Sequence, residues 1–191
     1  MEPTDPRHLL VEIAKILERL GVPYLITGGI AVLVWGRPRF TADIDIVVEL
    51  RASKITALAD ALHRLGPAGY LDPAQLERAL ATEGEFNFID GTTGVKVDFW
   101  ILKGSDAFDR SRLGRRVAKK ILGQRVYFSS PEDLVLIKLI WHKASPSSRQ
   151  LEDVESIFKI SGGELDWTYL REWGERLGVW EDLQSLLAQR E

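Results

Sequence analysis

The chain has 191 residues, of which 45% are hydrophobic and 28% are charged, with a formal net charge of −3 and no cysteine. This composition supports a buried core, excludes disulfides and thiolate metal sites, and argues against a general nucleic-acid coat protein, since such proteins are usually strongly basic. No apolar run approaches the roughly 20 residues of a membrane-spanning helix, and the acidic start lacks the pattern of a signal peptide, so we expect a cytoplasmic protein with no membrane partner.

The first part of the chain alternates helical and strand patterns. Apolar residues recur at helical spacing from residue 6, and Gly21 and Pro23 end this helix. Ser53 is suited to cap a later helix, and β-branched or alternating segments between turn residues predict strands. Helices are predicted over 6–20, 30–35, 53–65 and 73–82, and strands over 24–27, 43–48, 86–89 and 95–101.

The second part changes from strands to helices. A basic stretch over 110–125 is typical of charged edge strands, which discourage aggregation, and a track for RNA is the weaker alternative. Ser130 and Pro131 are suited to open a helix. Strands are expected near 115–121 and 125–128, and helices over 131–142, 149–160, 166–176 and 180–189. This order predicts an α+β fold: a mixed sheet flanked by helices at 1–130, and a helical C-terminal region packed on that core at 131–191.

Two carboxylates stand side by side at the start of the strand 43–48. Residues two apart on a strand point to the same face, so Asp43 and Asp45 project together while Ile44 faces the core. Two like charges this close repel unless a cation lies between them, and a hard divalent ion with oxygen ligands meets that need. An isolated Asp-Ile-Asp is more often a solvated strand start, so this pattern needs support from its neighbourhood.

That support comes from Gly28 and Gly29, which follow a strand and begin a helix. Glycines at such a place let the backbone approach a phosphate, whose charge the helix N-terminus favours. The sequence lacks the glycine patterns of P-loop and Rossmann proteins. A phosphate loop and a metal pair separated by one short helix and loop predict a site for a nucleoside triphosphate with its ion.

A third carboxylate is expected on the strand 95–101. Its odd-numbered residues are apolar, so Lys96, Asp98 and Trp100 share the other face. Asp98 is therefore able to join the metal site or to take a proton from an attacking hydroxyl. Asp90 is the alternative third acid, but it lies in a turn-like stretch.

The chain resembles the nucleotidyltransferase (polymerase-beta-like) superfamily in Thr27-Gly28-Gly29, in Thr41-Ala42-Asp43-Ile44-Asp45 and in the later strand aspartate. More narrowly, it is similar to the AbiEii-like nucleotidyltransferases, many of them toxins of toxin–antitoxin pairs. The residues that carry this similarity are Gly28-Gly29-Ile30-Ala31, Arg39-x-Thr41-x-Asp43-Ile44-Asp45 and Ser130-Pro131-Glu132-Asp133-Leu134 with Lys138. The similarity covers roughly residues 10–160.

The resemblance implies a nucleotidyltransferase-type core and a site with defined roles. Asp43, Asp45 and Asp98 would bind Mg²⁺ or Mn²⁺ and carry catalysis. The nucleotide-binding residues would be Thr27, Gly28, Gly29, Arg39, Thr41 and Lys138. For Lys138, a buried stem with its ammonium in water is the other interpretation, and Arg149 and Asp153, one helical turn apart, are expected to form a surface pair.

The predicted activity is the transfer of a nucleoside monophosphate from a triphosphate to an acceptor: tRNA, a protein or a small molecule. The resemblance adds a toxin role and an antitoxin partner to the hypotheses, and the tryptophans of the C-terminal helices suggest a homo-oligomer. A non-catalytic nucleotide-binding or regulatory protein on the same fold is the alternative. A nuclease is the weaker hypothesis, because nuclease sites usually include histidines. The three histidines of this chain, His8, His63 and His142, lie far from the aspartates in the sequence.

Overall fold

The computed structural model describes residues 5–66 and 68–188, and these residues form two compact units. The first unit comprises the described residues up to Ile30 together with Thr41–Phe128. The second comprises Ala31–Phe40 and the described residues from Ser129 onward. The division falls inside the helix α2 (Gly28–Trp35), whose first three residues belong to the first unit.

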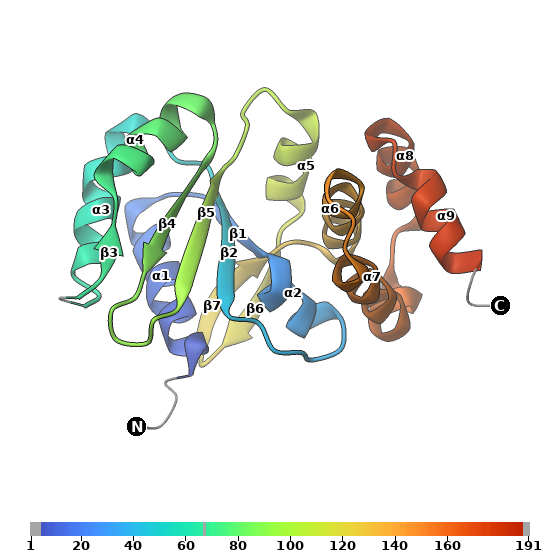
Figure 1. Cartoon of the computed structure of the whole chain (residues 1–191), viewed down its shortest axis with the longest axis horizontal. Helices are drawn as coiled ribbons and strands as arrows, with labels where there is room; N and C mark the ends of the chain where they lie inside the picture. Colours follow the sequence, from blue (N-terminus) through green and yellow to red (C-terminus); the bar gives the residue numbers. More distant parts are fainter. Residues whose placement is uncertain (1–4, 67, 189–191) are drawn as a thin grey trace. The chain divides into compact units, whose positions relative to one another are not determined.

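The first unit is built on a mixed sheet (Figure 1). Within the described residues this sheet has seven strands in the order β3-β4-β5-β2-β1-β7-β6. β2 pairs with β5, and β1 with β7, in parallel, while the other neighbours are antiparallel. The strands are β1 (Tyr24–Thr27), β2 (Asp43–Val48), β3 (Tyr70–Leu71), β4 (Glu85–Ile89), β5 (Lys96–Ile101), β6 (Val117–Ile121) and β7 (Gln124–Phe128).

Helices cover both faces of this sheet. Figure 1 shows α1 (Pro6–Leu20), α3 (Ile55–His63) and α4 (Pro73–Thr82) on one side and α5 (Ala107–Arg115) on the other. The alternation of β2 and β5 puts Ile44, Ile46, Val97 and Phe99 on one face, where all four are at most 1% exposed. This apolar face forms the main core of the unit.

The opposite face of the sheet is apolar at one end and polar at the other. Leu25, Val47 and Leu102 form a buried cluster against Leu113 of α5. Two residues earlier than Val47, the same face of β2 carries Asp45 instead. The carboxylates therefore lie next to an apolar patch that a helix shields from water.

The second unit is helical. Its helices are α6 (Pro131–Ala144), α7 (Ser148–Ser161), α8 (Trp167–Leu177) and α9 (Trp180–Ala188), with a short 3₁₀ turn at Gly162–Glu164. Trp35 fixes α2 to this unit, because its Nε1 donates to the Ser129 carbonyl at 2.8 Å and its own carbonyl accepts from Ser161 Oγ at 2.7 Å. None of the described helices is long and apolar enough to cross a membrane.

The structure confirms the predicted mixed α and β architecture with a helical end, and it corrects three local predictions. α2 begins at Gly28, two residues earlier than expected. Ser53 does not cap a helix: it lies in a 3₁₀ turn (Ala52–Lys54), and α3 begins after Lys54 without a side-chain cap. Part of the basic stretch is the helix α5, whose cap Asp106 accepts from two backbone N–H groups. The last predicted residue of the final helix, 189, lies outside the described residues.

Candidate active site

Three carboxylates share one face of two adjacent strands. In the parallel register of β2 and β5, Asp45 stands opposite Asp98, and Asp43 stands opposite Lys96. Residues paired across neighbouring strands point to the same face, as do residues two apart along a strand. Asp43, Asp45 and Asp98 are each partly exposed, so the structure places them together at the surface of the sheet.

Lys96 adds a positive charge to this group. Its ammonium lies 2.8 Å from Asp98 Oδ2. The hydrogen bond to Asp98 raises the pKa of Lys96, partial burial opposes this rise, and the negative charges of Asp98, Asp43 and Asp45 add to it. As the side chains lie, no group of three or more His, Cys, Asp or Glu residues in the described part of the chain could hold a metal ion.

Gly28 closes one side of the carboxylate group. Its φ of 60° lies in the left-handed region, and an added Cβ would overlap Oδ2 of Asp45. Glycine is therefore required here for its backbone conformation and for the room that Asp45 occupies. The sequence pattern of glycine pair and aspartate pair thus reflects a direct contact in the fold.

Thr27 brings an unsatisfied hydroxyl to the same place. It stands opposite Asp45 in the antiparallel register of β1 and β2 and is 1% exposed. Its Oγ1 has no hydrogen-bond partner among the described residues. A buried hydroxyl without a partner costs free energy, so this atom is suited to meet a bound ligand.

The first unit thus carries oxygen donors of the kind that binds a divalent ion, although their side chains do not converge on one point. Carboxylate oxygens are the ligands that Mg²⁺ and Mn²⁺ prefer, and the N-terminus of α2 favours an anion. Thr41 lies close by in the sequence, and its Oγ1 donates to the Asp43 carbonyl at 3.4 Å. Asp90, the alternative third acid, instead accepts from the backbone N–H and the hydroxyl of Thr93, which makes it a turn residue.

The other predicted nucleotide-binding residues belong to a second charged group. Arg39 donates through two nitrogens to both carboxylate oxygens of Asp153, at 2.6 and 2.7 Å. Lys138 lies 2.8 Å from the same carboxylate, and the side chains of Lys138 and Asp153 are each 3% exposed. Burial alone would raise the pKa of Asp153, but the two cations outweigh it and hold this pKa below its usual value.

These contacts correct one prediction and exclude one alternative. Asp153 does not form a surface pair with Arg149, because it is buried and bound by Arg39 and Lys138. Lys138 does not extend its ammonium to water either. Sequence reasoning named Asp153 but missed its burial, although the apolar residues Val154, Ile157 and Phe158 mark the buried side of α7.

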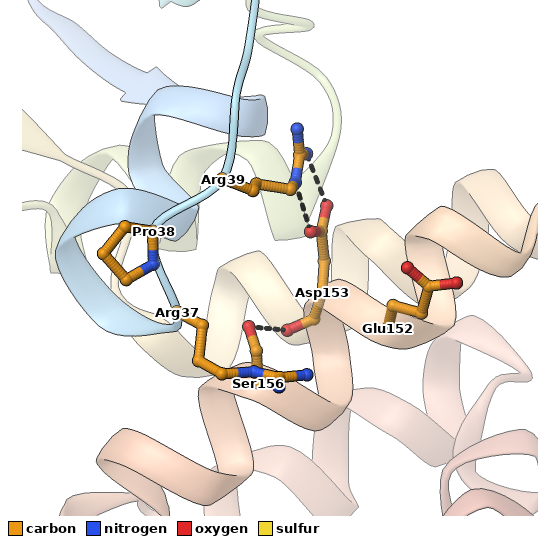
Figure 2. Close-up of a pocket in the computed structure, with 6 residues that line it drawn as sticks. All are labelled: Arg37, Pro38, Arg39, Glu152, Asp153 and Ser156. Carbon is orange, nitrogen blue, oxygen red and sulfur yellow. Dashed lines mark hydrogen bonds and ion pairs between the residues drawn. The ribbon is translucent and has the colours of Figure 1, made fainter.

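A small recess opens beside this group (Figure 2). It has a volume of about 180 Å³ and is lined by Arg37, Pro38, Arg39, Glu152, Asp153 and Ser156. Ser156 Oγ donates to the Asp153 carbonyl at 2.9 Å. An added Cβ at Gly36 would overlap Ser156 Oγ, so the loop before the recess packs closely on α7.

Solved structures with a similar fold include nucleotidyltransferases. The solution structure of ANT(2'')-Ia, an antibiotic-resistance factor, has a TM-score of 0.59 and 17% identity over 96% of this chain and 98% of that one. The chain has a nucleotidyltransferase fold. A nucleotidyltransferase-like protein from Paracoccidioides brasiliensis (TM-score 0.55, 19% identity, coverage 95% and 91%) shares it. The lincosamide antibiotic adenylyltransferase LnuA, bound to lincomycin, also shares it, with a TM-score of 0.53 and 16% identity over 82% of this chain and 98% of that one.

The sequence comparisons add no narrower assignment. No protein-family model matches the chain, and no curated protein matches it. Within the nucleotidyltransferase fold, the resemblance to AbiEii-like proteins therefore stays a prediction.

Proposed function

We propose that this chain is a metal-dependent nucleotidyltransferase, which transfers a nucleoside monophosphate from a nucleoside triphosphate to an acceptor. The observation that carries the proposal is the register of β2 and β5, which gathers Asp43, Asp45 and Asp98 on one face. The contact of Gly28 with Asp45 and the unpaired hydroxyl of Thr27 support a phosphate beside these acids. Residues 1–130 would supply this core, and 131–191 the helical region.

Asp43 and Asp45 would hold Mg²⁺ or Mn²⁺ with Asp98 as the third acid. Such an ion supplies charge stabilisation at the transferred phosphoryl group. The N-terminus of α2 at Gly28 and Gly29, with the Thr27 hydroxyl, would bind the triphosphate. Thr41 would extend this binding. Arg39 and Lys138, to which the resemblance gives the same role, are instead bound to Asp153 in the second unit.

Asp98 has the chemistry of a proton acceptor for the reaction. The acceptor oxygen bonds to the α-phosphorus while the bond from that phosphorus to the bridging oxygen breaks, so that pyrophosphate leaves with the electron pair. The carboxylate of Asp98 takes the proton of the acceptor hydroxyl. Positioning and electrostatics dominate this kind of transfer, and the apolar cluster of Leu25, Val47 and Leu102 borders the acids on the same face of the sheet.

A small hydroxyl-bearing molecule is the first acceptor to test. One structure with this fold holds ANT(2'')-Ia with adenylyl-2''-tobramycin (TM-score 0.56), and another holds LnuA with lincomycin. These ligands belong to those proteins, and they support a small acceptor here more than tRNA or protein. A toxin role with an antitoxin partner is a further hypothesis from the sequence resemblance, and self-association is one from the tryptophans of the C-terminal helices.

The ion pair between Lys96 and Asp98 favours a second candidate. A lysine bound to the third acid is consistent with a protein that binds nucleotide without turning it over. Such a protein would act as a sensor or as part of a complex. The two candidates differ in a single observable, the release of pyrophosphate.

The deciding experiment incubates the protein with each α-³²P-labelled triphosphate, Mg²⁺ and one acceptor class at a time: aminoglycosides, lincosamides, total tRNA and protein. Asp43→Asn and Asp45→Asn serve as controls. Label transferred by the native chain and lost in both variants would establish the enzyme and its acceptor. Metal-dependent nucleotide binding without transfer to any class would instead support the sensor.

A further inference from the structure

Lys96 lies where its charge acts on all the acids of the candidate site. It precedes Asp98 by two residues, so both side chains lie on the same face of β5. It also stands opposite Asp43 in the register with β2. Its ammonium contacts Asp98 Oδ2 at 2.8 Å, while 42% of its side chain is exposed. The lysine is therefore held by Asp98 while its side chain is partly open to solvent.

We propose that Lys96 is an internal counter-ion that a divalent metal ion must displace from Asp98 before the three carboxylates can bind the metal. This inference rests on the proposed function, because it concerns the same metal site. The physical reason is charge: the ammonium on Asp98 Oδ2 places a positive charge where the divalent ion would bind, and like charges repel.

The pairing also explains how the acids coexist without a metal. Three carboxylates on neighbouring positions repel one another, and one ammonium offsets part of that repulsion. A flexible four-carbon stem lets the ammonium leave without any movement of β5. The lysine lowers the affinity for a bare metal ion, so that the metal binds best together with the negative charge of a nucleotide.

The first test measures Mn²⁺ affinity without nucleotide, from the electron paramagnetic resonance signal of free Mn²⁺. Lys96→Met keeps the length of the side chain and removes its charge, and we expect it to bind Mn²⁺ about fivefold more tightly than the native chain. Lys96→Arg, which keeps the charge, should bind like the native protein. Lys120→Met is the matched control, because Lys120 is an exposed lysine on β6, and its affinity should not change.

The second test is a crystal structure of the native protein with Mn²⁺. We expect the metal at the carboxylates and the Lys96 ammonium out of hydrogen-bond reach of Asp98. An ammonium that stays on Asp98 beside the metal, or equal Mn²⁺ affinities for the native chain and Lys96→Met, would overturn the inference and leave the proposed function intact. No Mn²⁺ binding by any variant, with or without a nonhydrolysable triphosphate, would remove the metal site and the inference together.

Discussion

The two charged groups of this chain have opposite balances of charge: carboxylates outnumber cations in the first, and cations outnumber carboxylates in the second. The group on β2 and β5 has three carboxylates and one lysine, and its members are partly exposed. The group around Asp153 has one carboxylate and two cations, and its central pair is 3% exposed. An excess of like charge at a surface favours the binding of a ligand of opposite charge. A buried carboxylate that is already bound by cations instead holds together the segments that carry these residues. We therefore assign ligand binding to the first group and structural support to the second.

Removal of the carboxylate at Asp153 should produce the largest effect on stability. Asp153→Asn removes one member of a buried ion pair, a change that typically costs about 3–5 kcal/mol. Urea unfolding followed by circular dichroism would measure this loss in the free energy of unfolding.

The matched control for this variant is Asp182→Asn. Asp182 lies 3.9 Å from Lys143, and the two side chains are 47% and 60% exposed. We expect a loss of at most about 1 kcal/mol there. Equal losses for the two variants would show that the Asp153 group does not support the fold.

The carboxylates of β2 should show the reverse pattern. Asp45→Asn is expected to lower kcat by about 10²–10³-fold, because it removes charge from the transition-state environment. The free energy of unfolding should change by at most about 1 kcal/mol, since Asp45 has two carboxylate neighbours to repel it. Steady-state kinetics with the acceptor that the labelling experiment identifies, together with urea unfolding, would measure both quantities. A stability loss as large as that of Asp153→Asn would remove the contrast between the groups.

Gly28 tests how closely the phosphate loop depends on the acids. Gly28→Ala adds a Cβ at a φ of 60° and into the place of Asp45 Oδ2. The left-handed conformation alone costs about 1–2 kcal/mol, and the displaced carboxylate should lower nucleotide binding and kcat as well. Gly104→Ala is the control, because its added Cβ meets nothing within 4 Å. Unfolding in urea and nucleotide titration of both variants would show whether the loss is specific to Gly28.

Local patterns predicted the strands and the acids of the first group, but not the pairing between them. Alternation placed Asp43 with Asp45, and Asp98 with Lys96, on single strand faces. Asp45 and Asp98 are 53 positions apart, and the sequence does not show which residues of two distant strands stand opposite each other. Their pairing across β2 and β5 is therefore known only from the structure. The sequence showed that Lys96 shares the face of Asp98, but not that its ammonium lies on that carboxylate.

The second group was predicted poorly because its contacts join distant segments. Arg39 and Asp153 are 114 positions apart, so no local pattern could pair them. The nearby Arg149 offered a plausible partner at helical spacing and led to the wrong prediction. The helix α5 was missed for a different reason: its many arginines obscure the apolar pattern, of which Phe108 is the buried member. Arg112 is buried as well, in contact with Asp109 and the Phe108 ring.

Acid titration tests the Asp153 group through stability alone, with no need of an activity assay. Asp153 has a lowered pKa in the folded chain, since the cations outweigh the opposing effect of burial. The unfolded chain therefore binds more protons than the folded chain just below the usual carboxyl range, and the stability from Asp153 is lost as the pH falls through its lowered pKa. The difference in unfolding free energy between the native chain and Asp153→Asn should be constant near neutral pH and shrink below about pH 4. Urea unfolding of both proteins across that range would measure it. A difference that stays constant into acid would mean that Asp153 has its ordinary pKa and that Arg39 and Lys138 do not stabilise its charge.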